Sequence, residues 1–502
     1  MEKIKYMSQK TLFMGLAAML FWIVLNAILN YDVIIYKFNP IILIFGIIVY
    51  LGVLLIIQKR LISKISKIRY LHFLIFALFF VFCLIIGINL RLNPSWDMGS
   101  VFNIAKNYAE HGTMGESGMY LVSYPNNILL ALMYMVIFKF AYLVGITDFI
   151  TVATVFNAII ITATVILTYY IAKEMYNKEK ATFVLLILFF TTPLYLHVAV
   201  YYTDSMSMFF STFTLYVYLL SEKQTDKWKK IALQIILGIL IVISWKIKIT
   251  GAFIAIAICV YRCITKCNKQ VLKNYLIVIP TIIAVFVGFS VCFERRISNR
   301  DYAEYYKMPW EHWIVLGLTG NGGFSQETYE FTNSFPTYKE KKQADINKIK
   351  EIVNNYNCND FIKHLTIKLK YAWTDGTYYA PEKLRRMPVN ESVLHKFVLT
   401  DGKYSVYYKY FPQVMHLTML ILIIFSCIKN IKNNSLSSKK LILVISMLGL
   451  MVFLMIWENR SRYILTMLPI YVLLSVDGID YLTNRLENKR IFLDKNIEGA
   501  DK

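Results

Sequence analysis

Apolar residues occur in long runs along most of the chain, and short polar or basic stretches separate them. A bilayer core of roughly 30 Å requires about 20 apolar residues in one helix. We therefore predict an all-α polytopic membrane protein with about 12–13 transmembrane helices. The predicted segments are Thr11–Asn30, Pro40–Ile57, Tyr70–Leu90, Asn127–Val144, Phe149–Ile171, Ala181–Val200, Ser205–Leu220, Ile231–Trp245, Gly251–Thr265, Tyr275–Phe293, Phe411–Ile428, Leu441–Trp457 and Tyr463–Val476.

Composition excludes a soluble enzyme and a disordered chain. Hydrophobic residues make up 57% of the sequence and charged residues only 17%, against about 25% charged residues in a soluble domain. The formal charge of +22 fits cytoplasmic loops rich in Lys and Arg, and we expect no nucleic-acid partner. The seven cysteines show neither a disulfide framework nor the spacing of a zinc site.

Basic residues gather in four short loops, which the positive-inside rule places in the cytoplasm. These loops are 59–69, 223–230, 262–273 and 429–440. The segments Arg91–Asn126 and Glu294–Tyr410 then fall on the outer side. However, two full crossings by Asn127–Val144 and Phe149–Ile171 would put Lys173–Lys180 outside, so we expect that one of the two does not fully cross.

This pattern divides the chain into five parts. They are a two-helix extension (1–69), a transmembrane module (70–293), a large extracytoplasmic domain (294–410), C-terminal transmembrane helices (411–480) and a short polar tail (481–502). Within the first outer loop, Trp96–Gly112 has an apolar face at helical spacing, which predicts a juxtamembrane helix on the membrane surface. Aromatic residues in the outer domain form either an interfacial belt, the favoured interpretation, or sugar-stacking surfaces. They are Trp310, Trp313, Tyr371, Trp373, Tyr378 and Tyr379.

Two carboxylates, Asp97 and Asp204, stand near the ends of apolar segments at the predicted outer face. Either could be the N-cap of the helix that follows. The functional alternative is a carboxylate at the lipid–water boundary that serves as a general base.

Cations complement these carboxylates. Lys246 and Lys248 lie at a hairpin tip, and Arg460, Arg462 and Tyr463 open the last span. Arg binds phosphate through two parallel hydrogen bonds and Lys binds it as a point charge. The alternatives are snorkelling to the interface for Lys246 and an ion pair with Glu458 for the arginines. Tyr124 and Asn126 lie where the first outer loop returns to the membrane and could contact hydroxyl groups.

In order and placement these motifs resemble the GT-C superfamily of membrane glycosyltransferases, especially bacterial relatives of protein mannosyltransferases and lipid A aminoarabinose transferases. The resemblance rests on Asp97 before the amphipathic helix, on Tyr124-Pro125, on Pro193 before Asp204, on Lys248 after Gly238, and on Arg462-Tyr463 with Pro469. It covers roughly residues 70–480. The sequence departs from protein mannosyltransferases in having one acidic residue where they have an Asp-Glu pair, and two apolar segments precede the core.

The resemblance implies a GT-C fold in the cell membrane with an extracytoplasmic active site. It implies transfer of a sugar from a polyprenyl-phosphate donor to a cell-envelope glycan or lipid, with inversion. Asp97 would be the base. Lys248, Arg460, Arg462 and Tyr463 would bind the lipid phosphate, and Asp204, Tyr124 and Asn126 would bind the acceptor or sugar. A divalent cation stays open as cofactor, and an envelope polysaccharide polymerase or a lipid-linked-glycan flippase is the alternative.

Overall fold

The fold is described here from a computed structural model of the chain, in which residues 2–29, 36–265, 269–297, 300–432 and 439–500 are described. Helices account for nearly all regular structure, and the described residues form no strand beyond one isolated bridge, Leu92 with Pro388. The helices of the apolar segments are α1 (Glu2–Leu29), α2 (Pro40–Ile56), α4 (Leu71–Asn89), α7 (Ile128–Leu143), α8 (Phe149–Met175), α9 (Lys178–Phe189), α10 (Thr192–Leu196), α11 (Thr203–Lys223), α12 (Lys227–Ile247), α13 (Phe253–Thr265), α14 (Lys269–Phe289), α23 (Ser405–Lys432), α24 (Lys440–Ile456) and α25 (Leu468–Ala500).

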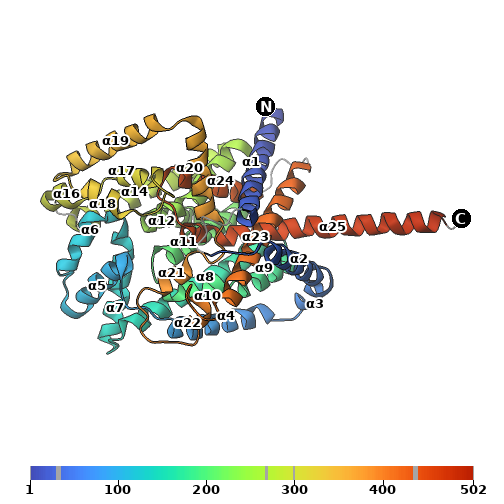
Figure 1. Ribbon diagram of the computed structural model, residues 1–502, viewed down its shortest axis with the longest axis horizontal. Coiled ribbons are helices and arrows are strands. Elements are labelled where there is room, and N and C mark those ends of the chain that lie inside the picture. The colour runs from blue at the N-terminus through green and yellow to red at the C-terminus, as the bar shows by residue number, and fades with distance from the viewer. Residues whose placement is uncertain (1, 30–35, 266–268, 298–299, 433–438, 501–502) are drawn as a thin grey trace.

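The polar segments are also helical. They contribute α3 (Ile62–Ile65), α5 (Trp96–His111), α6 (Met119–Ser123), α15 (Arg295–Ile297), α16 (Arg300–Tyr306), α17 (Glu311–Leu318), α18 (Gln326–Asn333), α19 (Tyr338–Asn355), α20 (Cys358–Trp373), α21 (Ala380–Leu384) and α22 (His395–Val398). In Figure 1, α5–α7 and α16–α19 lie together at the left end, opposite the projecting end of α25. The residues predicted as a separate tail continue α25 as far as Ala500.

Nine helices of the described residues are long and apolar enough to cross a membrane, or ten if the bent pair α9 and α10 is one span. The sequence predicted 12–13. The difference arises because α13 and α24 are short and α11 is rich in buried Ser and Thr. The bend of 57° between α9 and α10 occurs at Pro193, which starts α10 and cannot continue a helix from the preceding turn.

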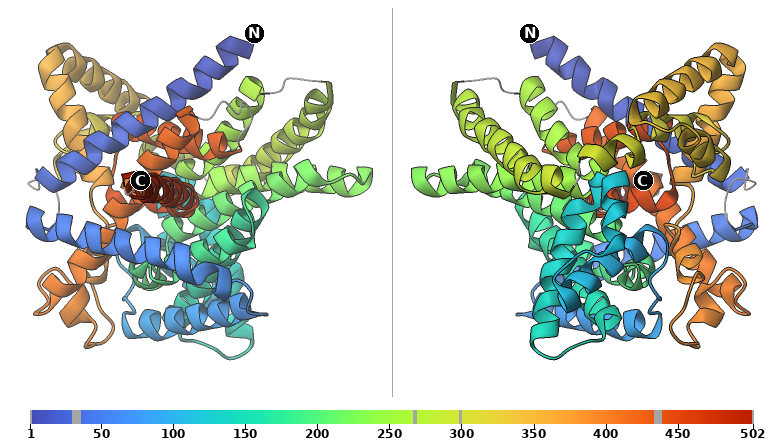
Figure 2. Two further views of the ribbon diagram at one scale, coloured as in Figure 1. Left: turned by 90° about the vertical axis from the view of Figure 1, so that its right-hand side faces the viewer. Right: turned by 90° about the vertical axis from the view of Figure 1, so that its left-hand side faces the viewer.

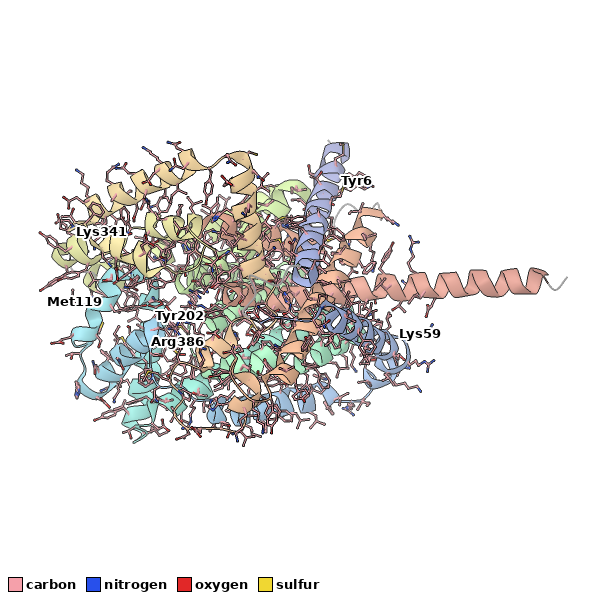
Figure 3. All side chains as sticks on the ribbon, viewed as in Figure 1. Tyr6, Lys59, Met119, Tyr202, Lys341 and Arg386 are labelled. Atoms are coloured by element: carbon pink, nitrogen blue, oxygen red, sulfur yellow. The ribbon has the colours of Figure 1, made fainter. Side chains whose placement is uncertain are left out.

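The basic loops share one end of the molecule. Ion pairs connect two of them and the loop after α8 to α25, and ion pairs of Lys223 with Glu174 and of Arg262 with Glu222 connect the other two to the ends of α8 and α11. Lys59 pairs with Glu487, Lys180 with Asp480, and Lys429 and Lys440 with the buried Asp477 of α25. Figure 3 places Lys59 at the right end, opposite Met119 and Lys341. The loop after α8 therefore lies on the same face as the other basic loops.

Helix α7 begins and ends at the opposite face, although its length and composition would permit a crossing. Just before its first turn, Asn127 bonds to the hydroxyls of Tyr120 and Tyr202. After its last turn, Asp148 pairs with Arg91 (3.3 Å), which directly follows α4. Since both ends lie beside outer-loop residues, α7 runs along this face, and the conflict in the predicted topology disappears.

The predicted juxtamembrane helix is α5, and its apolar face is buried as expected. That face packs against α7, as in the ring pair of Phe102 and Phe138 (5.2 Å), rather than only against lipid. Figure 2 shows α5 and α7 as one layer beneath the outer helices α16–α19. Elsewhere, close packing depends on Gly478 of α25, where a Cβ atom would lie 1.8 Å from the Leu422 carbonyl oxygen of α23.

This topology predicts the sidedness of cysteine labelling. In a cysteine-free background, Thr147→Cys after α7 and Ser334→Cys in the outer domain should react with a membrane-impermeant thiol reagent from the same side. Lys178→Cys should react only after the membrane is permeabilised. All three positions are exposed. Labelling of Thr147→Cys together with Lys178→Cys would contradict the placement of α7.

Candidate active site

A cavity of about 660 Å³ lies between α5, the loop before α7, the α12–α13 hairpin, the outer domain and the start of the last span. This volume is within the range of small-molecule sites, about 300–1,000 Å³. Seven of the eight predicted site residues line it: Asp97, Tyr124, Asn126, Lys248, Arg460, Arg462 and Tyr463. Figure 3 labels Tyr202 and Arg386, which also line it and which come from segments far apart in the sequence.

Asp204 lies beneath the cavity in an ion triad. Its carboxylate, 1% exposed, pairs with the Lys248 ammonium and with the Arg462 guanidinium (3.1 Å). The N-cap of α11 is Tyr202, which makes no side-chain capping bond, so the capping interpretation of Asp204 was wrong. Because both carboxylate oxygens are occupied, the geometry makes Asp204 the counter-ion of two cations.

Asp97 is not a helix cap either. The N-cap of α5 is Ser95, and Asp97 lies one residue inside the first turn and lines the cavity. Tyr120 and Tyr202 surround it, and burial, together with Tyr202 and the Asp97 carboxylate, raises the pKa of Tyr120. Its neighbour Trp96 has a φ of 45°, an unfavourable conformation for a bulky residue and one that often occurs at functional sites.

The outer domain holds the segment that carries Asp97. The Asn93 amide donates to the Met387 carbonyl (2.7 Å), and the Val389 amide donates to the Arg91 carbonyl (2.9 Å). This short bridge brings α21 and the residues after it against Trp96. It therefore places two further cations at the cavity.

These cations, Lys383 and Arg386, were missed by the sequence analysis. The Lys383 ammonium lies 4.1 Å from the centre of the Trp96 ring, and the Arg386 guanidinium lies 5.1 Å from it. Lys383 is only 4% exposed and has no ion-pair partner among the described residues. Burial, with Arg462 and Arg386 nearby, lowers the pKa of Lys383 to about 6. In the sequence, Lys383 lies two residues after Pro381 and shortly before Arg385 and Arg386, and no apolar span adjoins it.

Arg460 is fixed by two tyrosines rather than by Glu458. Its guanidinium donates to the hydroxyls of Tyr379 (2.6 Å) and Tyr371 (3.0 Å). Arg462 pairs with Asp204 instead of Glu458. The alternative of an ion pair with Glu458 is therefore wrong for both arginines. Lys246 does not snorkel freely but pairs with Glu294 (2.6 Å).

The aromatic residues of the outer domain do not form one belt. Trp310, Trp313 and Tyr379 line the cavity, whereas Trp373 and Tyr378 are fully buried against α23 and α25. Tyr124, Asn126 and Asn127 line the cavity near Tyr202. The favoured interpretation of these rings as an interfacial belt therefore does not fit their positions.

The residues around Asp97 offer a poor set of ligands for a metal ion. Within the part of the chain that the structure describes, no group of three His, Cys, Asp or Glu side chains could hold one. The second carboxylate, Asp204, is already bound by two cations. We therefore derive no role for a divalent cation.

Comparison with known proteins gives one family and several solved structures. A family model described as "conserved hypothetical integral membrane protein" matches residues 5–480. A search of curated proteins finds no match. The chain is similar to the oligosaccharyltransferase of Archaeoglobus fulgidus tethered with an acceptor peptide containing the NVT sequon, with a TM-score of 0.43 and 14% identity, over 84% of this chain and 51% of that chain.

The apo form of that oligosaccharyltransferase matches with a TM-score of 0.41 and 14% identity, over 85% of this chain and 52% of that one. ArnT from Cupriavidus metallidurans bound to undecaprenyl phosphate matches with a TM-score of 0.33 and 12% identity, over 82% of this chain and 78% of that one. The chain spans about half the length of the oligosaccharyltransferase.

The ion triad predicts that replacing Asp204 destabilises the protein much more than replacing Asp97 does. Asp204→Asn leaves two buried cations without their counter-ion and should lower the free energy of unfolding by about 3–5 kcal/mol. Asp97→Asn removes no ion pair of the described residues and should have little effect. Thermal unfolding of both purified variants in detergent measures the difference. Equal melting temperatures would show that Asp204 does not have this structural role.

Proposed function

The chain belongs to the family of conserved hypothetical integral membrane proteins, and we propose that it is a membrane glycosyltransferase of the GT-C type. The proposed donor is a sugar on a polyprenyl phosphate, and the proposed acceptor is a cell-envelope glycan or lipid at the outer face. One observation carries the proposal. A carboxylate, Asp97, and a buried lysine without an ion-pair partner among the described residues, Lys383, line the same cavity.

In the proposed reaction, the Asp97 carboxylate takes the proton of an acceptor hydroxyl. The acceptor oxygen attacks the anomeric carbon, and the bond from that carbon to the phosphate oxygen breaks with its electron pair leaving on the phosphate. The configuration at the anomeric carbon inverts because attack and departure occur on opposite faces of the sugar. A positioned base typically contributes about 10²- to 10⁴-fold to the rate.

The cations have unequal parts in this proposal. Lys248 and Arg462 share the single negative charge of Asp204, so they supply part of the positive charge and fix the floor of the cavity. Lys383 and Arg386 have no such partner among the described residues and are suited to the charge that develops on the leaving phosphate. Fixed charges in a partly dry site stabilise such a transition state strongly because they need no reorganisation.

The location of the cavity supports access to a lipid-linked donor. It opens among the ends of membrane helices, where Trp245 and Lys246 of α12 meet Glu294 after α14. The faces of α2 and α14 expose many large apolar side chains, as expected for helices in contact with lipid. A polyprenyl chain could remain in the bilayer while its phosphate reaches the cavity.

Asp97→Asn tests the base. The rate of sugar transfer should fall by about 10²- to 10⁴-fold, while protein level and donor binding stay near wild type. Envelope glycans from cells with wild-type protein, Asp97→Asn or no protein measure the effect and identify the sugar. Glu110→Gln, on the same helix, is the matched control. Full transfer by Asp97→Asn, with a glycan defect in the null strain, would favour a polymerase or flippase.

The pH dependence of anion binding tests whether Lys383 belongs to the phosphate site. In the free protein its amine is mostly neutral above about pH 6, so binding of an anion must take up a proton. Affinity for farnesyl sulfate, whose charge is constant near neutral pH, should therefore fall by up to about tenfold per unit between about pH 6 and pH 8. Lys383→Arg stays charged and should remove this pH dependence. An unchanged pH profile in Lys383→Arg would exclude Lys383 from the site.

A further inference from the structure

The end of the cavity beneath the outer domain is lined by rings. This part, which we name the aromatic arm, draws on α17, α18, α19 and the end of α24. Helices α17–α19 lie together in Figure 1, and α17 contacts α24. The aromatic arm consists of Trp310, Trp313, Phe324, Tyr329, Tyr338, Phe453 and Trp457.

Several contacts fix α17 against the end of α24 and so hold the aromatic arm in place. Gly317 lets the two backbones meet, since a Cβ atom there would lie 2.0 Å from the Ile456 carbonyl oxygen. The Glu458 amide donates to the Trp313 carbonyl (2.9 Å). Lys368, fully buried, donates to the carbonyls of Gly317 (2.5 Å) and Trp457 (2.9 Å).

These contacts hold Trp313 and Trp457 in a parallel stack, with ring centres 5.9 Å apart and planes at 2°. Tyr124, from the loop before α7, meets the edge of the Trp313 ring. At the outer rim, Trp310 is 52% exposed and Phe324 is 50% exposed. Clustered exposed rings that are not covered by the protein itself indicate a binding surface.

Polar groups surround the rings. His312 and Lys307 line the same part of the cavity, and Tyr329 and Tyr338 bring hydroxyl groups to it. A hydrocarbon chain laid here would cover these polar groups without giving them hydrogen bonds, which costs free energy. A pyranose ring has an apolar face of C–H groups for the indoles and a rim of hydroxyls for the polar side chains.

We propose that the aromatic arm binds sugar rings of a carbohydrate acceptor, so that the acceptor is an envelope glycan rather than a lipid or a protein. The proposal rests on the proposed transferase function and names the acceptor for it. The glycan would extend from Asp97 beneath α17 and leave the cavity past Trp310. Its terminal hydroxyl would then lie next to the base.

Trp310→Ala tests the proposal, since Trp310 lies at the rim and its loss should leave the Trp313–Trp457 stack intact. The control is Trp228→Ala, a 74% exposed tryptophan at the start of α12, at the basic end. The probes are short oligosaccharides released from the envelope glycan of the producing cells, and farnesyl phosphate. Saturation-transfer NMR on purified protein should show contacts to the ring protons of the sugar.

In Trp310→Ala, affinity for the oligosaccharides should fall about three- to tenfold, and the KM for the acceptor should rise equally. Affinity for farnesyl phosphate and kcat should stay at the wild-type level, as should every value for Trp228→Ala. Phe324→Ala replaces Trp310→Ala if the latter does not fold.

Unchanged oligosaccharide binding in Trp310→Ala would overturn the proposal, and a loss of farnesyl phosphate binding instead would assign the aromatic arm to the prenyl chain. Either result, combined with an inactive Asp97→Asn, would leave the transferase function standing. An active Asp97→Asn would remove that function independently.

Discussion

The structure around the cavity depends on compensating charge at membrane depth. A Lys or Arg side chain without a counter-ion costs free energy in a membrane-embedded protein. Such residues therefore pair with an acidic side chain or face water. Asp204 on α11 meets this requirement for Lys248 after α12 and for Arg462 at the start of the last span. One carboxylate thereby joins three segments that are up to 258 residues apart in sequence. The floor of the cavity is the place where they meet.

Two of the contacts between the outer domain and the rest of the chain lie next to the cavity. The bridge of residues 91–93 with 387–389 fixes the segment before Asp97. The turn after α20 is anchored by Asp375, which accepts hydrogen bonds from Ser461 (2.6 Å) and from the Tyr379 amide (2.9 Å). Tyr378 and Tyr379 in that turn have positive φ values, as does Trp96. Local strain is thus concentrated where the outer domain shapes the cavity, and the surrounding contacts must maintain it.

The cations of the cavity fall into two kinds because of these contacts. Lys248, Arg460 and Arg462 are held by Asp204 or by tyrosine hydroxyls. Lys383 and Arg386 contact a tryptophan ring and have no carboxylate partner among the described residues. Burial of the Lys383 amine without an ion-pair partner among the described residues is expensive for the fold. Its position in the cavity that Asp97 also lines is therefore better explained by ligand binding than by stability.

The sequence by itself determined the elements of this protein. The apolar runs predicted the helices, and the basic loops predicted which ends of these helices lie on the same face. The polar residues at the ends of the spans identified Asp97, Lys248, Arg460 and Arg462, which line the cavity. The hydropathy of a segment depends only on the residues of that segment, so it can be determined from the sequence alone. Its limit is visible in α7, which is apolar enough to cross but begins and ends on one face.

Only the tertiary structure decided which charges pair and which remain free. Asp204 is a counter-ion because it contacts Arg462, and Lys383 lies at the cavity because it contacts Trp96. No local sequence pattern links the segments that make these contacts. The same holds for Trp313 and Trp457, which stack although they are 144 positions apart. Burial, ion pairing and ring stacking depend on distances in space, whereas the sequence specifies distances along the chain.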